Sequence, residues 1–348
     1  MRRSVITFAL IIFSSAWIAA QSSISVLDNA IIKAEDRIET STLPSFKNLE
    51  SFIIWSDGSF RYKNYYNGVS GETLHQIQSQ TKSIVSLLFG IAVDKGFVKS
   101  EYETVSSFFP EYFNNKDSLK SSVTIRDLLT MSAGFEWEEM LPFNDQRNNN
   151  IQMNYSGNYL KYALIRPTVV RPFTEFKYNS GFPMIVAGII EKTTNMPLDK
   201  FAEKYFFNPL NIKKYRWIKD STGFCHAGGG LFLKPEDMVK IGVMVLNKGR
   251  WEGKGIVSEE WLERSFQPYF KTTFSDHSYG YFWWIKDVMR SDGKSTKVIS
   301  AQGAGGQYMY IIPEYDLIVS FTENNFGTPI VGPFLFEAYI IPALMYLK

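Results

Sequence analysis

A serine and a lysine three positions apart have the types and spacing needed for nucleophilic catalysis. Ser79 and Lys82 lie in the segment 78–83, Gln-Ser-Gln-Thr-Lys-Ser, and side chains three residues apart share one face of a helix. A serine hydroxyl is a weak nucleophile until a neighbouring base takes its proton. A lysine can be that base where burial disfavours its charged form. The pair is a candidate nucleophile and base, although Ser-x-x-Lys alone is too short to be specific.

The run that follows this pair, from Ile84 to Val93, is apolar on nearly all sides. A helix without a polar face must be buried all round. Lys95 and Gly96 suit its C-terminal end. The sequence therefore predicts a buried central helix with Ser79 in its first turn, where unpaired backbone N–H groups can stabilise an anion.

Length and composition predict one large, two-lobed globular unit. The chain has 348 residues, of which 45% are hydrophobic and 21% are charged, an ordinary globular balance. Without Arg2 and Arg3, the 37 basic residues fall to 35, which equals the 35 acidic residues. A neutral mature chain argues against a nucleic acid as partner. The sequence leaves the oligomeric state open.

Residues 1–20 have the pattern of an export signal. Arg2 and Arg3 precede a short apolar run that ends in small residues at Ala20, as in a cleavable signal peptide. The run is too short for a comfortable transmembrane helix, and an uncleaved anchor is the alternative. We therefore expect a periplasmic or extracellular protein whose mature part, residues 21–348, does not insert stably into a membrane.

The small number of cysteines and histidines limits the disulfides, metal sites and histidine-based catalytic groups that the chain can form. Cys225 is the only cysteine, so no internal disulfide can form. The histidines are His75, His226 and His277, and none has the spacing of a metal-binding motif. Their number leaves a Ser-His-Asp triad open, but the Gly-x-Ser-x-Gly signature of a nucleophile elbow is absent. We expect no metal and no organic cofactor.

Patterns of strands and helices predict a sheet built from both ends of the chain. Strands are expected at 51–55, 59–65, 298–301, 307–312 and 317–322, and helices at 22–40, 84–93, 123–131, 183–192, 197–206, 235–247 and 330–347, with another helix starting at Ser258. An Asp57-Gly58 turn is expected between the first two strands, and Thr124, with Asp127 three residues later, is expected to cap the helix at 123–131. Such a sheet is antiparallel or mixed, which indicates an α/β (α+β) fold with flanking helices.

The same patterns predict how the two lobes divide the chain. The sheet lobe takes about 21–75 and 270–348, and a mainly helical lobe takes about 76–269. A seam between lobes is a common place for a ligand site. Residues 135–158 are polar and aromatic with little periodicity, so we expect them to form either the rim of a substrate pocket, with Trp137 and Tyr155, or a mobile surface loop.

Two further motifs could complete a site around Ser79. Tyr178, in Phe-Lys-Tyr-Asn-Ser-Gly at 176–181, has a phenol that can exchange protons. The segment 301–307, Ala-Gln-Gly-Ala-Gly-Gly-Gln, joins two expected strands, and its glycines permit close approach of the backbone to a ligand. Each motif alone is a weak indication. Together, the Ser79 and Lys82 pair, the Tyr178 motif and the glycine-rich segment 301–307 follow one another along the chain.

In that order the motifs resemble the penicillin-recognising serine hydrolases. This family includes class C β-lactamases, D-alanyl-D-alanine peptidases, and esterases and amidases built on the same plan. The resemblance covers residues 30–345, including 124–134, Gly-Gly-Gly-Leu at 228–231 and Tyr-Gly-Tyr at 279–281. It implies a DD-peptidase/β-lactamase-like fold and a serine hydrolase that works through an acyl-enzyme.

The resemblance also implies roles for individual residues. Ser79 would be acylated, Lys82 would be its base partner, and Tyr178 would be a proton shuttle. The backbone N–H groups of Ser79 and Ala304 would form the oxyanion hole; a frame shifted to Gly306 would instead place Gln307 as the second donor. The residues expected to contact the substrate are Ser180, Ala301, Gly303 and Gly305, together with the rim residues Trp137 and Tyr155.

Two departures from the family pattern bear on the substrate. Ser180 replaces the asparagine of Tyr-x-Asn, and Ala301 and Gln302 replace the Lys and Thr that would hold a substrate carboxylate. These changes favour the esterase and amidase branch, near 6-aminohexanoate-dimer hydrolase. We therefore expect a small-molecule ester or amide substrate. The alternatives are a β-lactamase or D-Ala-D-Ala carboxypeptidase, and a penicillin-binding sensor with slow turnover.

Overall fold

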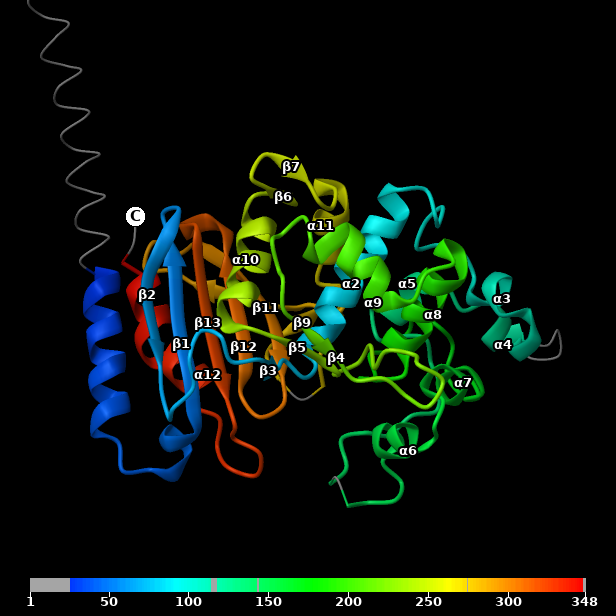
Figure 1. The fold of residues 1–348 in the computed structure, drawn as a ribbon, viewed down its shortest axis with the longest axis horizontal. Coiled ribbons are helices and arrows are strands. Elements are labelled where there is room, and N and C mark those ends of the chain that lie inside the picture. The colour runs from blue at the N-terminus through cyan, green and yellow to red at the C-terminus, as the bar shows by residue number, and fades with distance from the viewer. Residues whose placement is uncertain (1–25, 114–117, 143, 274, 347–348) are drawn as a thin grey trace, which may run out of the picture.

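A computed structural model of the chain describes residues 26–113, 118–142, 144–273 and 275–346 (Figure 1). The expected export signal at 1–20 lies outside these residues. Among the helices that are described, none combines the length and the apolar character needed to cross a membrane. Figure 1 shows one large sheet with helices on both of its faces and a mainly helical region to one side.

The large sheet has eight strands in the order β2-β1-β13-β12-β11-β10-β9-β8. Their bounds are β1 Leu49–Ser56, β2 Ser59–Tyr65, β8 Phe270–Lys271, β9 Ser278–Tyr279, β10 Trp284–Met289, β11 Ser295–Gly303, β12 Gln307–Ile312 and β13 Leu317–Glu323. All neighbours pair antiparallel, and β1 lies against β13 with Ile53 opposite Ser320. The predicted sheet from both chain ends is confirmed, although β8, β9 and β10 were not predicted.

The hairpin between β1 and β2 follows directly from its sequence. Asp57 and Gly58 both have positive φ, 50° and 78°, as a two-residue type I′ turn requires. Every residue of β1 except Glu50 is buried, because this strand lies between β2 and β13 and is covered on both faces. Its continuous apolar run is typical of such a strand.

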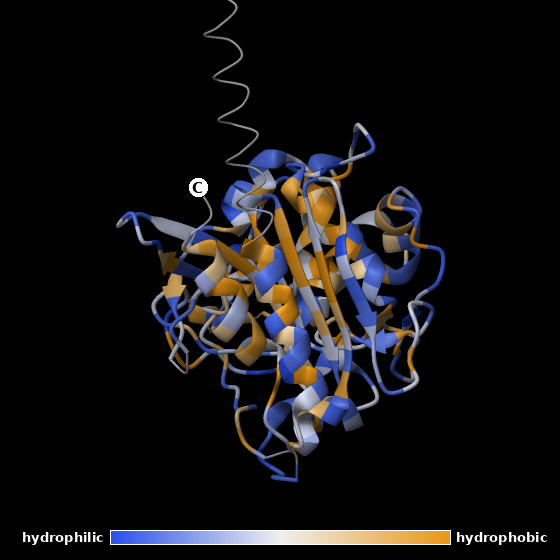
Figure 2. Ribbon diagram, turned by 90° about the vertical axis from the view of Figure 1, so that its left-hand side faces the viewer, coloured by the Kyte–Doolittle hydropathy of each residue, from blue (hydrophilic) through white to orange (hydrophobic). Residues whose placement is uncertain are grey.

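Helices cover the sheet on both faces. A helix at 26–40 and the C-terminal helices α12 Gly332–Leu335 and α13 Ile341–Leu344 enclose one core with residues of the outer face, among them Phe52, Val298 and Phe321. A π-helical stretch, η5 Phe336–Ile340, joins α12 to α13 just before Pro342, which lacks the N–H of a regular helical turn. Figure 2 shows hydrophobic colouring along several strands and on parts of the helices beside them, and hydrophilic colouring on many of the outer loops.

The inner face carries the two helices that matter for the site. These are α2 Gln80–Asp94 and α10 Pro235–Leu246, which contact β11 and β12–β13 respectively. Every residue of α2 from Gln80 to Ala92 is buried, as the apolar run predicted. Because α10 packs on the sheet, it does not belong with the helical region, where the proposed lobe boundaries would place it.

The helical region is built from many short elements. They are α3 Val105–Phe108, η2 Pro110–Tyr112, α4 Ser118–Ser121, α5 Ile125–Leu129, α6 Asn149–Tyr155, α7 Tyr159–Leu164, α8 Phe182–Thr194, α9 Leu198–Ala202, the π-helical η3 Glu203–Phe207 and α11 Glu259–Ser265. The predicted cap of α5 is present, since Thr124 and Asp127 bond each other's backbone N–H groups. The segment 135–158 contains α6 and is therefore not the structureless loop that its sequence indicated.

The remaining elements connect these layers. They are η1 Pro44–Asn48, η4 Pro313–Tyr315, the small sheet of β3 His75–Gln76, β5 Leu231–Leu233 and β4 Arg216–Trp217, and the pair β6 Arg250–Trp251 with β7 Lys254–Gly255. The small sheet fixes the chain just before Ser79, because Ile77 donates its N–H to the Leu231 carbonyl.

Candidate active site

Ser79 and Lys82 meet at the N-terminus of α2. Lys82 Nζ lies 2.8 Å from Ser79 Oγ and 2.7 Å from the carbonyl oxygen of Gly228. The lysine side chain is almost completely buried. Burial lowers the pKa of Lys82 to about 8, and the Glu139 carboxylate opposes this shift. Lys82 is thus an amine that can lose its proton near neutral pH.

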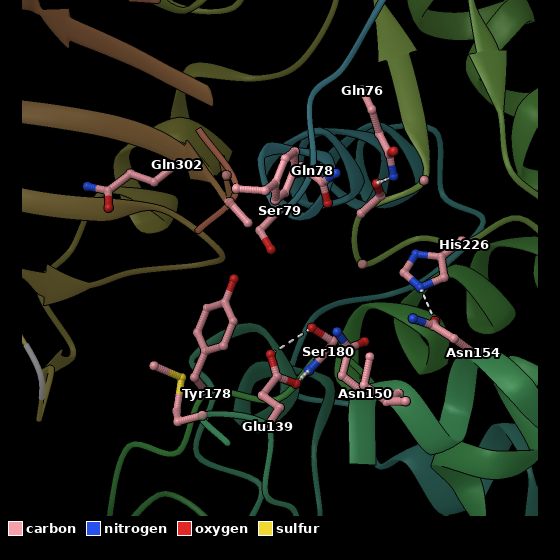
Figure 3. A pocket seen from close by; sticks show the side chains of 18 of the residues that line it. Gln76, Gln78, Ser79, Glu139, Asn150, Asn154, Tyr178, Ser180, His226 and Gln302 are labelled. Carbon is pink, nitrogen blue, oxygen red and sulfur yellow. Dashed lines mark hydrogen bonds between the residues drawn. The ribbon is translucent and has the colours of Figure 1, made fainter. Parts of the chain in front are cut away.

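Tyr178 approaches Ser79 from the opposite side of the cavity (Figure 3). Its phenol shares a hydrogen bond with the Ser79 side chain, and Lys82 Nζ lies 4.9 Å from the centroid of its ring. Burial and then the charge of Glu139 raise the pKa of Tyr178, whereas the hydrogen bond with Ser79 lowers it. Because burial favours the neutral form of both groups, part of the amine is unprotonated near neutral pH and available to accept a proton, while the phenol keeps its proton and is available to donate it.

Backbone donors for an oxyanion lie beside Ser79. Ser79 is the N-cap of α2, and Ala304 begins the turn after β11; among the described residues, neither N–H has a backbone or side-chain acceptor. A Cβ at Gly303 would lie 2.5 Å from the Ile77 carbonyl oxygen, so only glycine lets β11 come this close to the Ser79 segment. The two N–H groups can therefore act on one substrate carbonyl.

The lining of the cavity supports Ala304 over Gln307 as the second donor. Gln307 is paired with Gly303 in the ladder between β11 and β12 and does not line the cavity, whereas Ala304 does. Gln78, directly before Ser79, has a φ of 49°, a left-handed conformation that is uncommon outside glycine and concentrates at functional sites. The chain turns sharply at Gln78 to present Ser79 to the cavity.

A cavity of about 870 Å³ opens in front of Ser79. Of the predicted site residues it is lined by Ser79, Tyr178, Ser180, Gly303 and Ala304. Its apolar lining comprises Met140, Leu141, Ile151, Tyr159, Ile218, Trp284, Tyr308, Phe326 and Ile330. Glu139 is the only carboxylate among the lining residues, and no lysine or arginine is among them. Neutral polar side chains, among them Gln76, Gln78 and Asn150, complete the lining, so the walls are mixed in polarity and carry one negative charge.

Four residues that the sequence assigned to substrate binding lie elsewhere. Trp137 is buried behind the wall, 1% exposed, and Tyr155 is 87% exposed on α6; neither lines the cavity. Ala301 is fully buried, because alternate side chains of β11 face opposite sides of the sheet and this one faces the core below α2. Gly305 lies outside the lining and packs against Phe326. The neighbour of Ala301, Gln302, reaches the cavity instead.

Glu139 is the main site residue that sequence reasoning missed. Its carboxylate accepts the backbone N–H of Ser180 at 2.6 Å, the Ser180 hydroxyl at 2.9 Å and the indole N–H of Trp137 at 2.6 Å. These bonds connect the 135–158 segment to the motif that carries Tyr178 (Figure 3). No local pattern identifies this glutamate, since its segment has no periodicity.

His226 is a second lining residue that was not predicted to face the cavity. Its Nε2 lies 2.8 Å from Asn154 Oδ1, and burial lowers its pKa to about 4. The imidazole is therefore neutral at working pH, and it adds no charge to the cavity. Within the described residues no group of three histidine, cysteine or acidic side chains could hold a metal ion.

The sequence profile described as Beta-lactamase matches residues 51–333. The chain belongs to the Beta-lactamase family. It is therefore a serine hydrolase of this family, and the resemblance drawn from the motifs is confirmed.

Known proteins similar to this Beta-lactamase-family hydrolase include 6-aminohexanoate-dimer hydrolase of Paenarthrobacter ureafaciens. That protein is 21% identical over 290 residues, covering 78% of this chain and 71% of its own length.

Two solved structures show the shared fold. EstCE1, a hydrolase with promiscuous acyltransferase activity, superposes with a TM-score of 0.71 at 15% identity, over 94% of this chain and all of its own. The octameric penicillin-binding protein homologue from Pyrococcus abyssi superposes with a TM-score of 0.66 at 20% identity. The match covers 91% of this chain and 76% of that one. The expected β-lactamase-like fold is confirmed.

Proposed function

We propose that this protein hydrolyses ester or amide bonds through an acyl-enzyme on Ser79. The observation that carries the proposal is the position of Lys82, whose buried amine lies 2.8 Å from Ser79 Oγ and has a pKa lowered to about 8. An amine of this kind can take the serine proton near neutral pH. Tyr178 on the other side of Ser79 supplies a neutral proton donor.

The proposed reaction has two halves. Neutral Lys82 accepts the Ser79 proton as Oγ attacks the substrate carbonyl, and the resulting oxyanion binds the N–H groups of Ser79 and Ala304. Tyr178 donates its proton to the departing alcohol or amine, and the Lys82 ammonium restores it. Water then attacks the carbonyl of the acyl-enzyme. Its proton moves through the same groups in the opposite direction, back to Ser79 Oγ, and the acid is released. Each turnover consumes one water and leaves all three side chains unchanged.

The charges around the cavity favour substrates without a carboxylate. No lining lysine or arginine can pair an anion, and the Glu139 carboxylate repels one. β-Lactams and D-Ala-D-Ala peptides both carry a carboxylate near the bond that is cleaved. The names of 6-aminohexanoate-dimer hydrolase and of EstCE1, a hydrolase with promiscuous acyltransferase activity, support amide cleavage and acyl transfer, and they do not bear on the charge of the substrate. We also propose that the protein is exported, on the pattern of residues 1–20.

A substrate panel tests this proposal directly. Neutral short-chain nitrophenyl esters should have a kcat/KM at least about a hundredfold above that of a chromogenic cephalosporin, since a missing charge partner and a repelling carboxylate together cost a few kcal/mol. A linear amide and a D-Ala-D-Ala peptide complete the panel. Faster turnover of the cephalosporin than of the esters would place the protein in the β-lactamase branch. A single burst without steady-state turnover would instead identify a sensor.

Glu139→Gln should shift the pH dependence of hydrolysis. The Glu139 charge raises the pKa of both Lys82 and Tyr178, so its removal makes proton loss easier. The rise of kcat/KM with pH should then move to lower pH, by about one unit. The maximal rate should also fall, because an amide cannot accept all three hydrogen bonds.

The matched control for this change is Glu138→Gln. Glu138 neighbours Glu139 in the chain, but it does not line the cavity, and its carboxylate bonds the Met140 N–H and lies 3.8 Å from Lys177 Nζ. Its pH profile should match that of the unmodified protein. Equal profiles for all three proteins would refute an electrostatic effect of Glu139 on the site.

A further inference from the structure

A second cavity lies beside the first, on the outer face of the sheet. Its volume is about 270 Å³, and its walls come from β10, β11 and β12 and from the C-terminal helices. Its apolar lining comprises Trp284, Val298, Tyr308, Tyr310, Pro333, Phe336 and Ile341. An apolar cavity of about 150 Å³ is enough to hold benzene, so the second cavity has room for an aromatic ring or a short alkyl chain.

The two cavities share one wall. Trp284, Gln302 and Tyr308 line both of them, which means that a single layer of side chains separates the space before Ser79 from the second cavity. Two of these residues are aromatic and packed: Trp284 stacks on Tyr178 with ring centroids 5.8 Å apart, and Tyr308 stacks on Tyr310 at 5.7 Å.

Gln302 is the adjustable part of this wall. It is partly exposed, and its amide nitrogen lies 2.9 Å from Ser300 Oγ and 3.3 Å from His277 Nε2. In Figure 3 its side chain points away from Ser79. Because Gln302 lines both cavities and its side chain has rotatable bonds, its rotation is a simple way to change the wall between them.

We infer that the second cavity is the subsite for the leaving group of the substrate, and that it takes the uncharged aromatic or alkyl part of an alcohol or amine. This inference rests on the proposed acyl-enzyme function. The leaving group departs next to its proton donor, Tyr178. The ring that stacks on Tyr178, Trp284, is part of the shared wall, so a group that departs there lies at the entrance of the second cavity.

The one lysine that lines this cavity, Lys286, is paired with two carboxylates of the protein. Lys286 Nζ lies 2.8 Å from Asp276 Oδ2 and 3.1 Å from Glu337 Oε1. With its charge already compensated, Lys286 does not provide a site for a carboxylate. The rings of Tyr310 and Phe336, stacked at 3.8 Å, offer a flat apolar surface instead. Both features favour an uncharged leaving group with a planar or extended apolar body.

Two series of esters test the inference. In the first, the acyl group is always acetyl and the alcohol grows from methanol to hexanol and benzyl alcohol. In the second, the alcohol is always methanol and the acyl chain grows. All members of the first series form the same acetyl-enzyme, so a preference among them reports acylation alone. We expect kcat/KM for benzyl acetate to exceed that for methyl acetate by about tenfold to a hundredfold, as burial of an aromatic ring predicts.

Ile341→Trp should remove this preference. Ile341 lies on α13, is half-buried and lines the second cavity but not the first, so a larger side chain fills the subsite without reaching Ser79. The ratio of benzyl to methyl acetate should fall to about one, with methyl acetate hydrolysed as before. Gln302→Ala should raise the same ratio, because it opens the wall. If Ile341→Trp does not fold, Val298→Phe fills the cavity from β11 instead.

The outcomes separate this inference from the proposed function. An unchanged ratio in folded Ile341→Trp, or a size preference confined to the acyl series, would overturn the assignment of the second cavity. Absence of an acetyl group on Ser79, examined by mass spectrometry after mixing with nitrophenyl acetate, would overturn the acyl-enzyme function itself. Acetylated Ser79 together with a fall in the ratio supports both.

Discussion

Ser79→Ala should lower kcat for a nitrophenyl ester by a factor on the order of 10³ to 10⁶, the range expected when a covalent nucleophile is removed. The loss is large because no other group can form the acyl-enzyme, whereas the oxyanion donors and the cavity remain. The fold should survive, since Ser79 Oγ lies at the cavity surface and, among the residues that the structure describes, bonds only the side chains of Lys82 and Tyr178. Steady-state kinetics and the circular dichroism of the variant check both expectations.

A fluorophosphonate probe gives a second readout of the same residue. Only an activated serine reacts quickly with such a probe, so the adduct should map to Ser79 and disappear in Ser79→Ala. Ser59→Ala is the matched control, because Ser59 is exposed in the β1–β2 hairpin and lies outside the cavity. An adduct on another serine of the unmodified protein would exclude the nucleophile assigned here.

Tyr178→Phe should reduce the rate by about 10² to 10⁴, the usual contribution of general acid–base catalysis. The change keeps the ring, and with it the stacking on Trp284, but removes the oxygen that carries the proton. Tyr279→Phe is the control: its ring centroid lies 6.3 Å from that of Tyr178, and it is buried but outside the cavity lining. Equal losses in the two variants would mean that the Tyr178 hydroxyl acts through packing and not through proton transfer.

The pH profile of the unmodified enzyme belongs to the same test. Lys82 must be neutral to accept a proton, and burial lowers its pKa to about 8, so kcat/KM should rise as the pH increases from about 7 to 9. The pKa of Tyr178 shifts upward, so the phenol stays protonated throughout this range. Because the two groups share Ser79, the observed midpoint belongs to the coupled pair. A rate that falls across this range would contradict Lys82 as the base.

Local patterns in the sequence predicted the elements that support the site. The apolar run after Lys82 predicted a helix buried on all sides, and α2 is such a helix. Asp57-Gly58 predicted a hairpin, and Thr124 with Asp127 predicted a capped helix. Each of these features depends on residues close together in the chain, where the physics of turns, caps and amphipathic faces acts directly.

The walls of the cavity could not be predicted in the same way. Whether Ala301 or Gln302 faces the substrate depends on the register of β11, and a shift of one residue exchanges the two faces. The Glu139 carboxylate is positioned by hydrogen bonds with Ser180 and Trp137, contacts that no periodicity encodes. The second cavity depends on how the C-terminal helices lie on the sheet, and that arrangement is a property of the whole fold.

The pairing of β1 with β13 has a consequence for how this enzyme comes to be active during its synthesis. A nascent chain that ends before β11 already contains Ser79, Lys82 and Tyr178, but β1 has no partner on the side that β13 will occupy, and the N–H of Ala304 does not yet exist. Pairing between distant parts of a chain forms late and slowly. The serine therefore gains its second oxyanion donor only after the chain has been made past β11 and has paired β1 with β13, so a shorter polypeptide carries the nucleophile without a complete hydrolase.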